Sequence, residues 1–251
     1  MSADPRPQSV RDQQSARAQL AAVAEAAAGD GSRGFGAFAD LPTPADSRAA
    51  AVLILFGVLD SLPSDHDADA RAVSRDLDVL LLARATTLRS HAGQVAFPGG
   101  RLDPGDDGPV QAALREAWEE TGLDPAGVEV LGTLENIPLE YSLHLVTPVL
   151  AWWRHPSPVR VVDEAESADV FRAPVADLLD PANRGVTVIR RDGQEWRGPG
   201  FLVPRFDAQS NRMGEHLVWG FTGMVLDGLF DRLGWTEPWD DSRELPLALP
   251  D

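Results

Sequence analysis

Two apolar segments constrain the fold of this chain more than any other feature. The segments Ala49–Leu59 (AAAVLILFGVL) and Leu77–Arg84 (LDVLLLAR) carry almost no polar side chains. Continuous apolar runs of this length are typical of strands that are buried on both faces. Because the rest of the chain mixes helical and strand patterns, we expect an α/β or α+β sandwich built around these two strands.

The remaining elements are predicted from periodicity and from turn residues. The helical patterns lie at Gln13–Ala28, Val110–Thr121 and Phe221–Leu233. Further strand patterns lie at Val128–Ile137, Leu143–Trp153, Val186–Arg191, Gln194–Gly198 and Phe201–Phe206, and Asp192-Gly193 is typical of a two-residue hairpin turn. We therefore predict an N-terminal extension with a helix (residues 1–45), one domain (46–234) and a C-terminal tail (235–251).

Composition narrows the class of protein. The chain has 251 residues, 43% of them hydrophobic, so it can bury a core. It has no cysteine, which excludes thiol chemistry and fits a reducing compartment. The formal net charge is −17 and every basic residue is arginine. We expect a soluble, cytoplasmic protein that binds neither nucleic acid nor membrane, and that receives an anionic ligand through metal ions and a few arginines.

Three carboxylates share one face of the helix predicted at Val110–Thr121. At 100° per residue, Glu116, Glu119 and Glu120 are neighbours, while Ala113, Ala117 and Trp118 are expected to pack on a sheet. Like charges at this spacing repel each other, and a hard cation such as Mg²⁺ would offset the repulsion. The alternative from these three residues alone is an ordinary solvated acidic face.

The residues around these glutamates favour the metal site. Gly99-Gly100 precedes the helix and allows a tight turn whose carbonyls can ligate a cation. Arg115–Leu123 (REAWEETGL) closely resembles the second half of the Nudix box, R-E, aliphatic, any, E-E, any, G, aliphatic. In the first half, Asp106 lies where the box has glutamate but leaves eight residues before Arg115, whereas Asp107 restores the usual seven. Either aspartate can take that role.

A second signature lies upstream. Leu80–Gly100 (LLLARATTLRSHAGQVAFPGG) is similar to the signature of the coenzyme A diphosphatase branch of Nudix hydrolases. The matching residues are Arg84, Leu88, Arg89, His91, Gly93, Gln94, Phe97 and Pro98. This resemblance implies a Nudix-type α/β/α sandwich with a mixed sheet, and hydrolysis of coenzyme A or its derivatives to 3′,5′-ADP and 4′-phosphopantetheine.

The resemblance also implies a role for each site residue. Glu116, Glu120, Glu119 and the Gly100 backbone would bind Mg²⁺ or Mn²⁺. Arg115 would orient the carboxylates, and either Glu119 or Glu166 would act as the general base. Arg84, Arg89 and Gly99 would bind the substrate. A homodimer is expected by the same analogy.

Two other functions compete with this one. A Nudix enzyme could act on ADP-ribose, NADH or a dinucleoside polyphosphate, because residues outside the box select the substrate. A catalytically silent Nudix protein could bind a nucleotide as a regulator, although all three box glutamates are present here.

Overall fold

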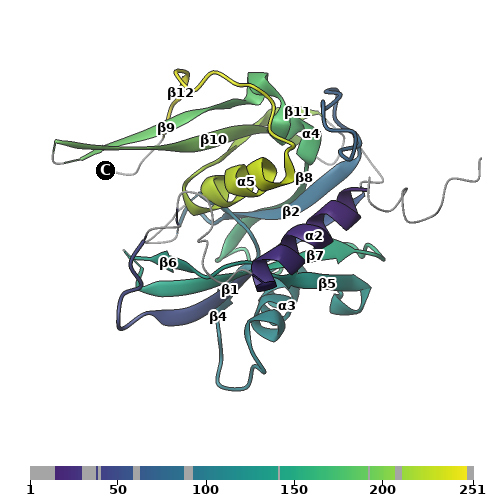
Figure 1. Cartoon of the computed structure of the whole chain (residues 1–251), viewed down its shortest axis with the longest axis vertical. Helices are drawn as coiled ribbons and strands as arrows, with labels where there is room; N and C mark the ends of the chain where they lie inside the picture. The colour runs from purple at the N-terminus through teal and green to yellow at the C-terminus, as the bar shows by residue number, and fades with distance from the viewer. Residues whose placement is uncertain are drawn as a thin grey trace, which may run out of the picture.

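A mixed, eight-stranded sheet forms the middle layer of the computed structural model (Figure 1). The structure describes residues 15–29, 38, 41–58, 63–87, 93–140, 142–191, 193–206 and 211–247. The strands of this sheet are β1 (Arg48–Val58), β2 (Leu77–Arg84), β3 (Val95–Ala96), β4 (Gly99–Arg101), β5 (Val128–Thr133), β6 (Ile137–Leu139), β7 (His144–Trp153) and β8 (Ser167–Pro174).

The order of the main strands is β3-β2-β1-β7-β5, with β4 on β1, β6 on β7 and β8 on β2. Strand β1 is central: it runs parallel to β7, where Leu53 pairs with Val149, and antiparallel to β2 and β4. A second, four-stranded sheet has the order β11-β10-β9-β12. Its strands are β9 (Arg184–Arg191), β10 (Gln194–Phe206), β11 (Arg212–Val218) and β12 (Glu244–Leu245).

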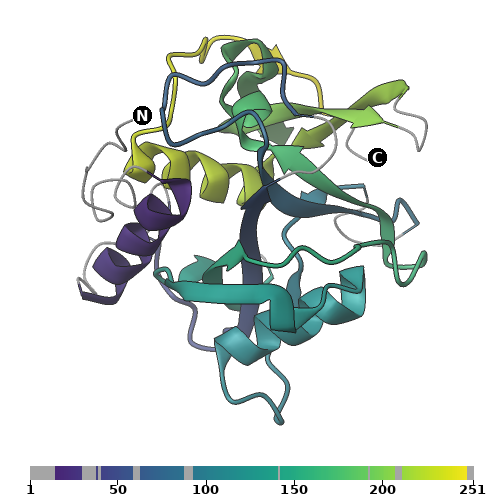
Figure 2. The ribbon, with the colours of Figure 1, turned by 90° about the vertical axis from the view of Figure 1, so that its right-hand side faces the viewer.

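Each face of the central sheet has its own apolar core. On β1, Leu53 and Leu55 face the alanines of α3 (Pro109–Thr121), whereas Ile54 and Phe56 face the opposite side. On that opposite side lie α2 (Ala16–Gly29), α5 (Gly220–Leu233), the short α4 (Val175–Leu179) and the second sheet (Figure 2). The two-sided burial of β1 explains its continuous apolar sequence. The expected sandwich with a mixed sheet is confirmed.

Most predicted elements are present with small changes of boundary. Strand β2 has the predicted ends. Strand β1 and helix α5 each begin one residue earlier than predicted, and the predicted last residue of β1, Leu59, lies outside the described residues. The predicted strand Val128–Ile137 is divided into β5 and β6, and the two strands predicted between Gln194 and Phe206 are one strand, β10. The turn residue Gly193 has a φ of 76°, as a hairpin of this type requires.

Five strands were not predicted. Two of them, β3 and β4, are only two and three residues long, and β4 contains the glycines that were expected to form a tight turn. The other three lack a clear apolar pattern. Strand β8 contains Asp169 and Arg172, and the guanidinium of Arg172 is bonded to the fully buried Asp78 of β2. Strand β11 is mostly exposed at its start. Strand β12 lies in the segment predicted as a tail, and it exists because it pairs in parallel with β9. In each case the partner strand, not the local sequence, decides the conformation.

The helix α2 packs into the same core as the rest of the fold. Its Leu20 and Ala24 are buried, and Gln19 accepts a 2.7 Å hydrogen bond from the indole of Trp235. Arg17 pairs with Glu129 on β5. None of the helices in the described ranges combines the length and the apolar character that a bilayer crossing requires. The proposed division of the chain at residues 45 and 234 stays a prediction.

The packing of α2 yields a stability prediction. Replacing Leu20, which is 0% exposed, by alanine removes buried methyl groups and leaves a cavity. We expect Leu20→Ala to lower the free energy of unfolding by about 2–4 kcal/mol in a urea titration. The exposed Glu25→Ala on the same helix is the control and should change it by less than about 0.5 kcal/mol. Equal effects of both changes would show that α2 is not part of the cooperative core.

Candidate active site

The inner face of the helix α3 is made of alanines, whose small side chains let the helix lie close to the sheet. Ala112, Ala113 and Ala117 are all 0% exposed and pack on β1 and β7. The helix ends at Gly122, which adopts a φ of 70° and donates its N–H to the carbonyl of Trp118 at 2.9 Å. The short side chains let carboxylates on the flank of α3 reach the strand β4.

The prediction that Trp118 packs on the sheet is wrong, since 57% of this residue is exposed. The buried stripe of α3 is narrow, and Trp118 lies about 100° further round the helix than Ala117. An indole would not fit between α3 and the sheet at the separation that alanines allow.

Two carboxylates of α3 meet the backbone of Gly99 and Gly100. The N–H of Gly99 donates a 2.9 Å hydrogen bond to the Glu120 carboxylate. The Glu116 carboxylate lies over Gly100 so closely that a Cβ atom there would be 2.5 Å from Cδ of Glu116. Glycine is therefore required at position 100 to make room for a carboxylate.

Arg115 donates hydrogen bonds to several carboxylates of this cluster and fixes their positions. Its guanidinium donates two hydrogen bonds to Asp106, at 2.9 and 3.1 Å, and one each to Glu116 and Glu119, both at 3.0 Å. A further bond reaches the carbonyl of Arg101 at 3.0 Å. Arg115 keeps the pKa of Asp106 below its usual range, so this carboxylate is charged.

Of the two aspartates that the sequence left open, Asp106 is the one that contacts Arg115. Its side chain is only 3% exposed. Asp107 is exposed and donates its backbone N–H to the side chain of Gln111 at the start of α3. The carbonyl of Arg101 was missed as a partner of Arg115, because a backbone acceptor leaves no signal in the sequence.

The electrostatics of the cluster favour binding of a cation. Burial raises the pKa of Glu120 to about 7, and the nearby charges of Glu116 and Glu166 act in the same direction. The Gly99 N–H and the charge of Arg84 oppose this shift. Burial also raises the pKa of Glu116, even though Arg115 is bonded to it. Two partly buried carboxylates thus share too little positive charge for both to ionise without cost.

Glu166 reaches this cluster from a different part of the chain. Its carbonyl accepts a 2.9 Å hydrogen bond from Ala85, just after β2, and β8 begins at the next residue. The segment before it is fixed on the end of α3, where Arg160 donates its N–H to the carbonyl of Thr121 at 2.9 Å. The side chain of Glu166 is exposed and has no hydrogen bond or ion pair with any described residue.

Arg84 ends β2 beside the same carboxylates. Its Nε atom is buried and has no hydrogen-bond partner within the described ranges. A buried, unsatisfied donor costs free energy unless a ligand accepts its bond. The predicted substrate residue Arg89, like Leu88 and His91, lies outside the described residues.

Glu119 differs from the other two glutamates of α3. Its side chain is 46% exposed and is bonded to Arg115. The structure therefore brings together Glu116, Glu120, Glu166, Arg84 and the two glycines, and leaves Glu119 on the outer rim.

The donors at this site fit a hard cation that keeps part of its hydration shell. In the described part of the chain no three acidic or histidine side chains converge to form a closed metal cage. Mg²⁺ does not require one, because it retains water and takes phosphate oxygens from the substrate. Glu116, Glu120 and the carbonyl of Gly100 offer oxygen atoms, which Mg²⁺ prefers as ligands. The absence of a side chain at Gly100 leaves room for the Glu116 carboxylate.

Comparison with known proteins places these features in one family. The NUDIX domain model matches residues 66–191. "Uncharacterized Nudix hydrolase NudL" of Photorhabdus laumondii is 37% identical over 152 residues, 60% of this chain and 74% of that protein. "Nudix hydrolase 3" of Caenorhabditis elegans is 34% identical over 155 residues, 59% of this chain. The match spans only 63% of the nematode protein's length.

A solved structure, a C. elegans Ap4A hydrolase in a binary complex, aligns with 49% of this chain and 77% of its own. Its TM-score is 0.36 and its sequence identity is 22%.

Substitutions of Gly99 and Gly100 are expected to affect two different properties, the stability of the fold and the affinity for Mg²⁺. In Gly99→Ala the new Cβ would lie 2.6 Å from the Cα atom of Val52, and backbone cannot give way, so we expect a loss of several kcal/mol of stability. In Gly100→Ala the clash is with the movable end of Glu116. Here we expect a folded protein whose Mg²⁺ affinity, measured by titration calorimetry, falls by about tenfold or more. Unchanged affinity would mean that Glu116 does not contact the cation.

The raised pKa of Glu120 predicts how stability depends on pH without metal. A carboxyl group with a raised folded-state pKa stabilises the protein below its unfolded pKa, and this stability is lost as pH rises through about 7. The Glu120→Gln variant should not lose this stability as the pH rises, because its side chain stays uncharged. In urea titrations with a chelator, we expect the variant to be more stable than the wild type at pH 8 by on the order of 2 kcal/mol, with a much smaller difference at pH 4.5. A difference independent of pH would contradict the shift.

Proposed function

The chain belongs to the Nudix hydrolase family, and from its site we propose that it hydrolyses the diphosphate linkage of a nucleotide derivative with the help of Mg²⁺ or Mn²⁺. The observation that carries this proposal is the convergence of Glu116 and Glu120 on the backbone of Gly99 and Gly100 in β4, beside the unsatisfied Nε of Arg84. Carboxylates for a cation and a guanidinium for phosphate lie together there.

Each residue has a separate task in this proposal. Glu116, Glu120 and the Gly100 carbonyl hold the cation, which when bound lowers the pKa of a coordinated water and neutralises phosphate charge. Arg115 fixes Glu116 from the opposite side, and Asp106 fixes Arg115. Arg84 donates to a phosphate oxygen of the substrate.

Glu166 is the better candidate for the general base. A base must be free to accept a proton from the attacking water. The carboxylate of Glu119 accepts a hydrogen bond from Arg115, which holds it on the exposed side of the helix. Glu166 has no such partner among the described residues and lies close enough to Glu120 to affect its pKa.

Coenzyme A is the substrate that the sequence favours. The upstream signature runs from β2 through Arg84 to Pro98, directly before Gly99 and Gly100. Cleavage would yield 3′,5′-ADP and 4′-phosphopantetheine. ADP-ribose, NADH and dinucleoside polyphosphates are the alternatives, and a non-catalytic nucleotide-binding protein is the less favoured one.

A substrate panel tests this proposal. The purified chain is incubated with Mg²⁺ and, separately, coenzyme A, acetyl-CoA, ADP-ribose, NADH and diadenosine tetraphosphate, and products are identified by mass spectrometry. We expect 3′,5′-ADP from coenzyme A at the highest rate. A chelator should abolish turnover, and Glu120→Gln should lower kcat by about 100-fold or more. Glu25→Gln, on the surface of α2, is the matched control.

The possible results separate the alternatives. Faster turnover of another member would keep the metal-dependent hydrolysis and reject coenzyme A as the substrate. No turnover of any member by folded, metal-loaded protein would favour the regulatory, nucleotide-binding alternative.

A further inference from the structure

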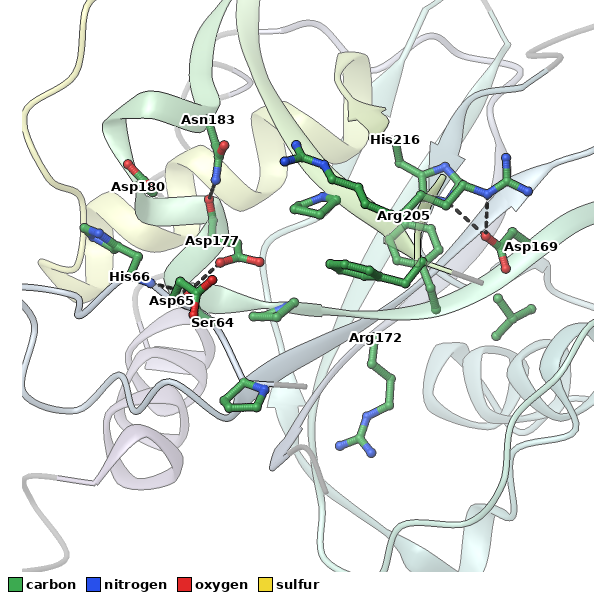
Figure 3. A pocket seen from close by; sticks show the side chains of 17 residues that line it. Ser64, Asp65, His66, Asp169, Arg172, Asp177, Asp180, Asn183, Arg205 and His216 are labelled. Atoms are coloured by element: carbon green, nitrogen blue, oxygen red, sulfur yellow. Dashed lines mark hydrogen bonds and ion pairs between the residues drawn. The ribbon is translucent and has the colours of Figure 1, made fainter. Parts of the chain in front are cut away.

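A cavity of about 720 Å³ lies beside β8, but its charges do not suit an anion (Figure 3). The arginines described in its wall already pair with carboxylates, namely Arg172 with Asp78, Arg205 with Asp169 and Arg212 with Glu215. At its other end three carboxylates gather, those of Asp65, Asp177 and Asp180. An anion that binds outside the proposed active site is therefore expected at another place.

The central sheet carries a group of basic side chains that have no carboxylate partner. Arg48 begins β1, Arg101 ends β4 and His144 begins β7, and β1 pairs with both other strands (Figure 1). Nε of Arg101 donates a hydrogen bond to Nε2 of His144 at 3.2 Å. Among the described residues, neither arginine forms an ion pair with an acidic side chain. We call Arg48, Arg101 and His144 the basic corner.

The three side chains of the basic corner lie on one face of the sheet. Arg48 pairs with His144, and Arg101 pairs with Ala50, two residues after Arg48. Paired residues, and residues two apart on a strand, point to the same face of a sheet. The hydrogen bond from Arg101 to His144 therefore crosses β1, and the small side chain of Ala50 leaves room for it.

This face is the one opposite to α3. Ala51 packs against α3, so the alternating Ala50 and the three basic side chains face away from that helix. Similarly, a Cβ at Gly100 would point at Glu116, whereas the side chain of the next residue, Arg101, lies on the other face. The basic corner is thus separate from the proposed cation site, and β4 is the strand that contributes to both.

The electrostatics of the basic corner favour an anion. Burial and the charges of Arg101 and Arg48 lower the pKa of His144, so its ring is neutral at pH 7. Because a guanidinium can only donate, Nε2 of this ring is the acceptor of the bond from Arg101. Two guanidinium groups beside a neutral ring leave a local excess of positive charge in a chain whose net charge is −17.

The turn before β7 fixes the basic corner. In the described ranges, Leu143 is the one residue other than glycine with a positive φ, 51°, which is disfavoured for a leucine. Its carbonyl accepts the N–H of Arg48 at 2.8 Å, and the backbone of Ser142 is bonded to the ring of His144. The hydroxyls of Ser47 and Ser142 are buried without a partner among the described residues. Backbone strain of this kind is commonly found at functional sites.

We propose that the basic corner binds inorganic phosphate, with Arg48 and the terminal nitrogens of Arg101 as the donors. The oxygen atoms of a tetrahedral anion point in several directions, so guanidinium groups from two strands can bind it together. Binding requires neither Mg²⁺ nor hydrolysis, and the site is therefore independent of the proposed function.

Calorimetry with inorganic phosphate tests this site. The full chain is titrated in the presence of a chelator and at constant ionic strength, so that general screening does not change. We expect the wild type to bind phosphate, and Arg48→Gln and Arg101→Gln each to weaken binding by about tenfold. Arg48→Lys should retain part of the affinity. Arg190→Gln, at an exposed arginine of β9 that pairs with Glu195 and Glu244, is the matched control and should change the affinity less than about twofold.

A second readout is the ring of His144 in an NMR titration. A bound anion favours the charged imidazole, so phosphate should raise the pKa of His144 in the wild type. It should have no such effect in Arg48→Gln.

Arg84→Gln shows whether the anion binds at the diphosphate site instead. Loss of phosphate binding in this variant but not in Arg48→Gln, or no binding by the wild type, would overturn the inference. A lower kcat/KM of Arg48→Gln with the preferred substrate, in buffer without phosphate, would also overturn it, because Arg48 would then belong to the substrate site. If the chain binds phosphate through Arg48 and Arg101 but hydrolyses no diphosphate, the proposed function fails while the phosphate site stands.

Discussion

The close approach of α3 to strands β1 and β4 is the constraint on which the site depends. Alanines on the inner face of the helix and the glycine at position 100 remove the side chains that would keep α3 and the strands apart, while Gly99 lets β4 lie against β1. The space gained above Gly100 is filled by a carboxylate and not by apolar atoms. A site built in this way resists change, because any larger residue on either surface pushes the helix or the carboxylate away.

Charge at this contact is partly compensated on one side only. There Arg115 donates hydrogen bonds to the carboxylates of Asp106, Glu116 and Glu119. The inner side holds Glu120 with one backbone N–H and the nearby Arg84, and burial raises the pKa of this carboxyl group. Such an unbalanced interior is typical of sites that complete their electrostatics with a ligand. The fold tolerates it because stability is supplied by the two apolar cores.

Strand β8 brings together segments that are far apart in the sequence. Glu166, directly before this strand, lies near the carboxylates of α3, whereas Asp169 and Phe171 line a cavity on the opposite face of the central sheet. Its own pairing with β2 is secured by the buried Asp78–Arg172 ion pair, which is costly to break once both charges are buried. The pairing of β8 with β2 thus fixes the position of Glu166 relative to the carboxylates of α3.

The sequence by itself determined the central strands, the carboxylate helix with its glycine stop, and the residue types of the proposed metal site, because these follow from local periodicity and from short spacings along the chain. It did not reveal β8, β11 or β12, whose polar side chains are explained only by partners such as Asp78. It placed Trp118 in the core, whereas the narrow alanine stripe leaves that side chain in solvent. The choice of Asp106 over Asp107 and the position of Glu166 near Glu120 were decided by the tertiary structure, because each depends on which segments the fold brings together.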